Sequence, residues 1–171
     1  MKAGARGIAI GVLALFALLS PALAEDGCGK FAWPLTRERA LLVSANKAAV
    51  KAGDTLTALP SAAFALQLQP GAEAKFTMPP EHKPKVEKWF GGAVHILPPP
   101  KAGIYQVTLT DEAWVDIVQD GRYARSVGST GRSDCLGLRK SVRLELTTAP
   151  FTLQVSGVAV ETIAVVFASA D

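Results

Sequence analysis

The stretch GIYQVTLTDEAWVDIVQDG, residues 103–121, decides the fold class of this chain. Apolar and polar side chains alternate over residues 104–109, which is typical of a strand that is buried on one face. A turn follows, and residues 113–118 return as a second, more uniformly apolar strand. The dipeptide Asp120-Gly121 tolerates the positive φ that a tight hairpin turn requires. The stretch therefore predicts strands joined by short turns.

The same pattern recurs on both sides of this stretch. Alternation is found over residues 64–68, 142–146 and 151–155, and a nearly continuous apolar run covers residues 162–167. Helical periodicity is confined to short segments such as residues 36–42, where a helical turn and a strand are both compatible with the pattern. We therefore expect an all-β fold: an antiparallel, jelly-roll-like β-sandwich of about eight strands with at most short helical turns.

Two segments are expected to lie outside the main strands. Residues 79–100 hold six prolines, which donate no ladder hydrogen bond, so this region is predicted to wrap an edge or connect two blocks. A single short helix is compatible with residues 84–90. The glycine-rich residues 127–133 are interpreted as a flexible loop.

The alternation also predicts the core, because one face of each strand must be buried. The outward positions Arg143 and Glu145 are expected to face solvent. The side chains expected to be buried are Phe64, Leu66, Leu68, Tyr105, Val107, Leu109, Val115, Ile117, Val142, Leu144, Leu146, Leu153, Val155, Ile163 and Val165.

Residues 1–24 have the order of a secretory signal peptide. Lys2 and Arg6 precede the uncharged run 7–19, and a small-residue cleavage site follows. The run is shorter than the roughly 20 apolar residues of a spanning helix. We expect one β-sandwich domain, residues 25–171, to be released into the periplasm or the medium without stable membrane insertion.

The charge balance argues against nucleic-acid binding. The chain is 49% hydrophobic and 19% charged with a net charge of +3, which fits an ordinary folded domain and excludes a disordered chain. The signal segment contributes two of the positive charges, so the exported part is close to neutral. Nucleic-acid binders need a strongly basic face, so we expect no nucleic-acid partner.

The chain contains two cysteines, Cys28 and Cys135. An even count in an exported chain predicts a disulfide. Lipid anchoring at Cys28 is disfavoured by the two carboxylates within residues 25–27, and a zinc site lacks neighbouring ligands. The predicted bond would fasten the N-terminal segment, with Phe31 and Trp33, onto the sandwich.

The chain offers few residues for catalysis or metal binding. His82 and His95 are its two histidines, thirteen residues apart, which is neither a helical spacing nor a recognised ligand spacing. We interpret one as a surface loop residue and the other as a solvent-facing strand residue. The glycines around Ser129 do not form the elbow of a serine hydrolase. We therefore expect no catalytic residue, no bound metal and no cofactor.

Aromatic and acidic residues supply the remaining candidates. Trp89 and Phe90, with Lys88 and other lysines nearby, form the best candidate for an exposed ligand-binding surface. Trp114 is interpreted as a core residue. The acidic side chains of the 111–120 region are interpreted as turn formers and solvated strand edges: Asp111, Glu112, Asp116 and Asp120.

Residues 103–166 resemble the bacterial pre-peptidase C-terminal type of β-sandwich, in the runs GIYQVTL, AWVDIV, KSVRLEL and PFTLQVSG and a cysteine-containing loop. From CGKFAWP at residue 28 onward, the chain also resembles a set of small exported bacterial proteins. Some of these carry the label homogentisate 1,2-dioxygenase. That label implies an iron centre with several protein ligands, for which this chain offers His82 and His95.

Together these observations predict an exported, non-catalytic binding or structural module of the bacterial cell envelope. Its ligand is a glycan, an envelope component or another protein, and an inhibitor or chaperone-like partner of an exported enzyme is a further form of the last. The alternative is a small iron-dependent dioxygenase that uses His82 and His95.

Overall fold

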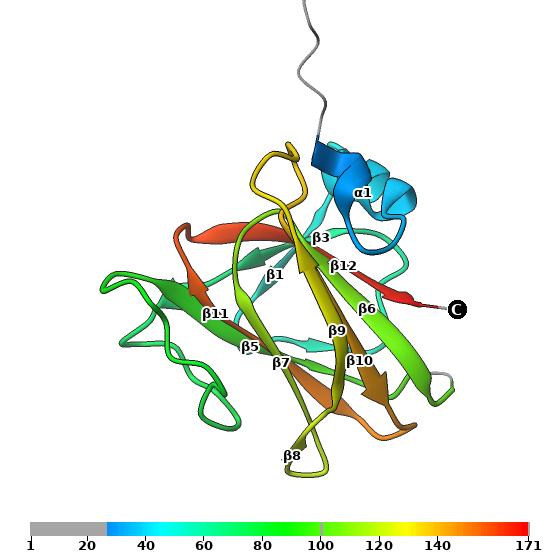
Figure 1. Cartoon of the computed structure of the whole chain (residues 1–171). Coiled ribbons are helices and arrows are strands. Elements are labelled where there is room, and N and C mark those ends of the chain that lie inside the picture. The colour runs from blue at the N-terminus through cyan, green and yellow to red at the C-terminus, as the bar shows by residue number, and fades with distance from the viewer. Residues whose placement is uncertain (1–26, 100, 171) are drawn as a thin grey trace, which may run out of the picture.

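The computed structural model describes residues 27–99 and 101–170, and the predicted signal peptide lies outside them. Two β-sheets pack face to face, and two short helices lie against the outer face of one sheet (Figure 1). These are a 3₁₀-helix, η1 (Gly27–Lys30), and an α-helix, α1 (Thr36–Val43). The all-β class and the sandwich predicted from alternation are confirmed.

Sheet A has the strand order β1-β3-β12-β6-β10-β9. Its strands are β1 (Ala48–Lys51), β3 (Phe64–Gln67), β12 (Thr162–Ser169), β6 (Gly103–Leu109), β10 (Lys140–Leu146) and β9 (Ser126–Gly131). Sheet B has the order β2-β5-β11-β7-β8, with β4 also paired to β5. Its strands are β2 (Thr55–Leu56), β4 (Gln69–Pro70), β5 (Phe90–Ile96), β11 (Phe151–Val158), β7 (Trp114–Gln119) and β8 (Arg122–Tyr123).

The prediction of about eight, purely antiparallel strands was imprecise. The described residues form twelve strands, and β1–β3 and β2–β5 pair in parallel. The additional strands are mostly two to four residues long, and so short a strand shows no readable alternation.

The main core lies between the two sheets. Fourteen of the fifteen predicted core side chains are buried there, and Val115 is partly buried against the same cluster. The β7–β8 hairpin turns at Asp120 and Gly121 with φ values of 51° and 69°, as the dipeptide predicts.

Four local predictions were wrong. The proline-rich residues 79–100 do not lie wholly outside the main strands, because residues 90–96 form β5, which pairs with β11 on one side and β2 on the other. The 127–133 region is not a loop throughout, since β9 pairs with β10 over Ser126–Gly131. Residues 84–90 form no helix. Arg143 does not simply face solvent, because its guanidinium carbon lies 4.3 Å from the ring centre of Trp33 and its Nε donates to Gln106.

The outer face of sheet A is covered by residues 27–43, which we call the cover. Its Leu35 and Leu42 are buried against Leu138 and Val166 in a second apolar cluster. The indole N–H of Trp33 also donates to the sheet, as described below. The predicted packing of the N-terminal segment against the sandwich is therefore confirmed.

The predicted disulfide fixes the cover. Cys28 in η1 and Cys135, in the loop between β9 and β10, are bonded, with their Cα atoms 4.7 Å apart and 107 positions apart in sequence. Trp33 adds a 3.3 Å hydrogen bond to Ser141, which in turn lies 3.0 Å from the hydroxyl of Thr108. Covalent and apolar contacts together hold this layer.

The outer face of sheet B is crossed by residues 77–86, which we call the strap. The amide of Gln154 in β11 accepts hydrogen bonds from the backbone N–H of Met78 and of the residue before it, and donates to the Met78 carbonyl. The hydroxyl of Tyr123 in β8 donates to the carbonyl of Pro79. Polar side chains of the sheet thus satisfy the backbone of an irregular segment.

Further along the strap, β7 supplies two more contacts. Asp116 accepts a 3.2 Å hydrogen bond from the backbone N–H of Glu81, and the ring of His82 stacks on Trp114 with centroids 4.1 Å apart. Two sequence interpretations need correction here. Trp114 lies half-buried on the outer face instead of in the core, and Asp116 is 5% exposed instead of solvated, because the strap covers them.

Candidate functional site

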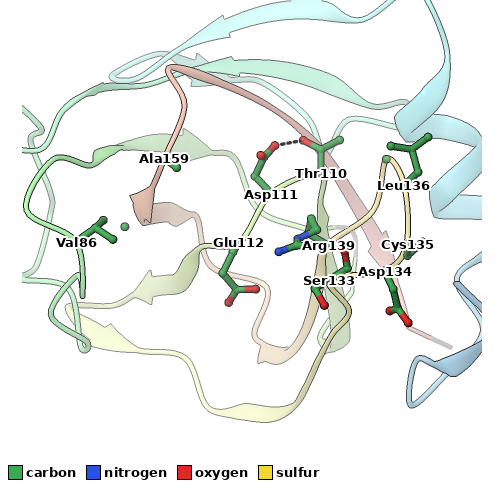
Figure 2. A pocket seen from close by; sticks show the side chains of 12 residues that line it. Val86, Thr110, Asp111, Glu112, Ser133, Asp134, Cys135, Leu136, Arg139 and Ala159 are labelled. Carbon is green, nitrogen blue, oxygen red and sulfur yellow. Dashed lines mark hydrogen bonds between the residues drawn. The ribbon is translucent and has the colours of Figure 1, made fainter. Parts of the chain in front are cut away.

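An open groove of about 710 Å³ lies at the end of the sandwich where β6 turns into β7 and β11 turns into β12. The loop between β9 and β10, residues 132–139, forms one side, and we call it the rim loop. Val86 of the strap and Ala159, in the turn after β11, stand on the opposite side (Figure 2). The two walls therefore belong to the coverings of different sheets: the rim loop is bonded to the cover, and Val86 belongs to the strap.

Exposed apolar side chains gather around this groove. Six large hydrophobic side chains are exposed in the described part of the chain, among them Val86 at 50% and Leu136 at 87%. Val43, 62% exposed, lies near the lining residue Gly137, and Val160, 42% exposed, follows the lining residue Ala159 in the chain. Val86 and Leu136 line it directly. Val43 approaches the rim loop, since a Cβ built on Gly137 would lie 3.1 Å from its Cγ1. Exposed apolar side chains that gather in one place are typical of surfaces that bind other molecules.

The floor between the walls is polar and comes from the β6–β7 turn. The hydroxyl of Thr110 donates to the carboxylate of Asp111 at 2.7 Å. The ammonium of Lys140 lies 3.0 Å from the carboxylate of Glu112 and 4.6 Å from the ring centre of Trp114. These contacts fix the floor while leaving acceptor oxygens on its acidic side chains.

The rim loop is tied down at several points. Arg132 binds the Asp134 carboxylate through two hydrogen bonds of 3.0 and 2.9 Å, and Arg139 donates to the Ser133 carbonyl. The side-chain hydrogen bond from Arg132 holds the pKa of Asp134 below its ordinary value. With Cys135 in the disulfide as well, this wall is fixed.

The opposite wall depends on a buried carboxylate. Burial raises the pKa of Asp116 above its ordinary value of 3.8, and the negative charge of Glu81 adds to the rise. The hydrogen bond from the Glu81 N–H and the nearby His82 act in the other direction. Since Asp116 holds the strap that carries Val86, this wall is tied to a titratable group.

The aromatic candidate from the sequence is engaged in packing. Trp89 and Phe90 are half-buried, and Lys88 is exposed in the preceding bend. A Cβ on Gly71 or Gly91 would clash with the Trp89 ring, which therefore lies directly on backbone. Phe76 also stacks beside Trp89 with centroids 6.3 Å apart. These three predicted ligand-binding residues lie outside the groove lining.

The two histidines lie at different places on sheet B. His95 is exposed on β5, with its Nδ1 2.9 Å from the hydroxyl of Thr152, whereas His82 stacks on Trp114. The strand register separates His95 from Trp114 by two strand spacings and four residues. That is about 10 Å across the sheet and about 14 Å along it.

This separation decides how the chain fits an iron centre. Two ligands of one iron must each approach within about 2 Å of it, and His95 and the His82 ring stacked on Trp114 lie too far apart to do so. In the described residues, no group of three or more His, Cys, Asp or Glu is placed to hold a metal ion. The residues present therefore do not fit the iron centre that the dioxygenase label implies.

Comparison with protein-family models, curated proteins and solved structures finds no match to this chain. The resemblance to the pre-peptidase type of sandwich stays a prediction from strand patterning. Within the residues that the structure describes, no helix is long and apolar enough to cross a membrane.

Sequence reasoning missed the groove, because four separate connections build it: the β6–β7 turn, the turn after β11, the rim loop and the strap. The clearest signal was Leu136, a large apolar residue between Cys135 and Gly137 in a loop whose ends are polar. The sequence did not place this leucine opposite Val86. Five strands, β5 to β9, lie between the two residues in the sequence, and their pairing brings the two side chains to the same groove.

Proposed function

We propose that this protein is an exported, non-catalytic binding module of the bacterial cell envelope, and that its groove holds an apolar segment of another exported protein. One observation carries the proposal: two of the six exposed large apolar side chains of the described residues, Val86 and Leu136, line a single groove from opposite walls, and Val43 and Val160 neighbour its lining residues Gly137 and Ala159. Exposed apolar patches rimmed by polar groups are typical of surfaces that bind proteins.

The chemistry of the groove favours a polypeptide over a glycan. Its lining contains apolar side chains, carboxylates and an arginine, and no aromatic ring that a sugar could stack on. The aromatic candidate Trp89 uses its ring for packing against two glycines and Phe76. An inhibitor or chaperone-like role belongs to the same class and is decided by the identity of the partner.

Export is supported by two independent features. The sequence of residues 1–24 has the order of a signal peptide. The Cys28–Cys135 bond is of the kind that persists in oxidising compartments such as the periplasm.

Site-specific photocrosslinking in the source bacterium tests the proposal. A photoreactive amino acid at Leu136 is expected to trap a protein partner, because this side chain is 87% exposed at the groove. The control position is Arg122, exposed in the β7–β8 hairpin at the other end of the sandwich (Figure 1). Equal labelling from both positions, or none from Leu136, would contradict a groove-directed partner.

Metal analysis of protein purified without a histidine tag tests the dioxygenase alternative. The separation of His82 and His95 leads us to expect no stoichiometric iron. Stoichiometric iron that is lost in His95→Ala would support the dioxygenase and overturn the binding module.

A further inference from the structure

The edge strands of the two sheets differ in how they resist strand addition. β2, β4 and β8 are two residues long, and β1 ends on the charged Lys51. Short strands and lysines are common protections of a sheet edge. β9 has neither: its six residues, Ser-Val-Gly-Ser-Thr-Gly, contain no charge and no proline. Among the described strands it is the edge best suited to pair with another chain.

The hydrogen-bond pattern shows which backbone groups of β9 are free. The N–H of Arg132, just beyond the strand, donates to the carbonyl of Arg139 in the same hairpin. Because backbone groups of successive residues point to opposite sides, Thr130 also faces β10, whereas Ser129 and Gly131 direct their N–H and C=O away from it. Within the described residues, no backbone hydrogen bond from outside the hairpin reaches these two.

The free edge of β9 continues into the groove. β9 ends at Gly131, and Ser133 and Asp134 line the groove two and three residues later. A Cβ built on Gly131 would lie 3.8 Å from Oε2 of Glu112 on the groove floor. An extended segment that leaves the groove at this point therefore lies along the unpaired side of β9.

We infer that the partner of the proposed function binds by strand addition: an extended segment of another exported protein pairs with Ser129 and Gly131 of β9 and places apolar side chains in the groove. This inference rests on the proposed function. In strand addition, main-chain hydrogen bonds supply affinity and pockets for side chains supply specificity. A second copy of this chain fits less well, because pairing two β9 strands antiparallel would bring Arg125 of one copy beside Arg132 of the other.

The experiment uses displayed random peptides of about twelve residues, long enough at about 3.4 Å per residue to span β9 and the groove. They are selected on the full exported chain with its disulfide intact. Ser129→Pro removes one outward N–H without touching the β10 ladder, and Ser129→Ala is the matched control. For a selected peptide, we expect Ser129→Pro to weaken binding about tenfold and Ser129→Ala to leave it unchanged.

A second measurement leaves the protein unaltered. In a strand that pairs with β9, every second backbone N–H of the peptide points toward β9. N-methylation of those amides is expected to weaken binding, and N-methylation of the amides between them is expected to leave it unchanged. The exchange of the Gly131 amide hydrogen is expected to slow when the peptide is bound. Both readouts remain decisive if Ser129→Pro fails to fold.

The outcomes separate the inference from the proposed function. Equal binding by Ser129→Pro and Ser129→Ala, together with loss of binding in Leu136→Ser, would overturn strand addition and leave the groove as the binding site. Selected peptides that depend on neither Ser129 nor Leu136 would overturn both. A dimer in sedimentation that Ser129→Pro converts to a monomer would assign the edge to a second copy and overturn the inference.

Discussion

The two outer faces of this sandwich are covered by different means. Over sheet A, the cover is held by the Cys28–Cys135 bond and by buried apolar side chains such as Leu138. Over sheet B, the strap is held by polar side chains, among them Gln154 and Asp116, that bind its backbone. The first layer is therefore sensitive to reduction and to cavities, and the second to the loss of hydrogen bonds and to pH.

This difference bears on the groove, because each layer contributes one wall. The rim-loop wall, with Leu136, is bonded to the cover, and the opposite wall, with Val86, belongs to the strap.

Removing the disulfide should have the largest effect. The double variant Cys28→Ala with Cys135→Ala loses a link across 107 positions. The chain-entropy model gives a loss of about 4–5 kcal/mol in the free energy of unfolding, which strain usually lowers. Chemical denaturation measures it. A loss below about 1 kcal/mol would mean that apolar contacts alone hold the cover.

Leu138 and Leu136 form a matched pair within the rim loop. Leu138 is fully buried under the cover and Leu136 is exposed at the groove. Leu138→Ala should lower the free energy of unfolding by about 2–5 kcal/mol, because transfer and cavity terms add. Leu136→Ala should change it by less than about 0.5 kcal/mol. Similar losses in both would show that the rim loop packs differently from this description.

Gln154→Ala tests the polar attachment of the strap. It leaves the N–H and C=O of Met78, and the N–H before it, without their partner. We expect a loss of about 1–3 kcal/mol and faster proteolysis within residues 77–86. The control is Gln67→Ala, at an exposed position of β3. Unchanged proteolysis of the strap would show that other contacts hold it.

Asp116→Asn should give the smallest effect, seen as a pH dependence. The pKa of Asp116 is raised in the fold, so the folded state holds its proton more tightly than the unfolded state. Wild-type stability is therefore favoured below the ordinary value of 3.8 and is lost as pH rises through the folded pKa. The asparagine variant removes this fall, because its side chain does not titrate.

The measurement is the difference in unfolding free energy between variant and wild type, followed upward from pH 3. We expect the difference to move in favour of Asp116→Asn as pH rises through that window. Asp120→Asn, at an exposed turn position, is the control and should show no such trend. A difference that is constant with pH would contradict the burial of this carboxylate under the strap.

Much of the fold was predictable because it depends on local sequence patterns, such as the alternation of apolar and polar residues, and on one covalent bond between the two cysteines. Alternation identified strands such as β6 and β10 and their buried faces, and the even cysteine count identified the disulfide. β9 was missed because glycine and serine give no alternation, and its pairing is set by β10. Arg143 was misjudged because Trp33, more than a hundred residues away, folds over it.

The candidate site was less predictable than the fold. Asp116 was expected to be solvated, and the sequence gives no sign that the strap, residues 77–86, covers it. Trp114 was expected in the core because it is aromatic and lies in an apolar run, yet the strand register turns it outward. The burial of Asp116 and the outward position of Trp114 depend on strand pairing and on contacts between distant segments, which no local sequence pattern encodes.

Binding at the groove is tested by titration calorimetry, which measures the affinity of the photocrosslinked partner, or of a selected peptide, for three variants of this protein. We expect Leu136→Ser and Val86→Ser, on opposite walls of the groove, each to weaken binding about tenfold. We expect no change for Leu97→Ser, which removes an apolar side chain that is 41% exposed and lies outside the groove lining. Equal affinities for all three variants would contradict the claim that the groove is the binding site.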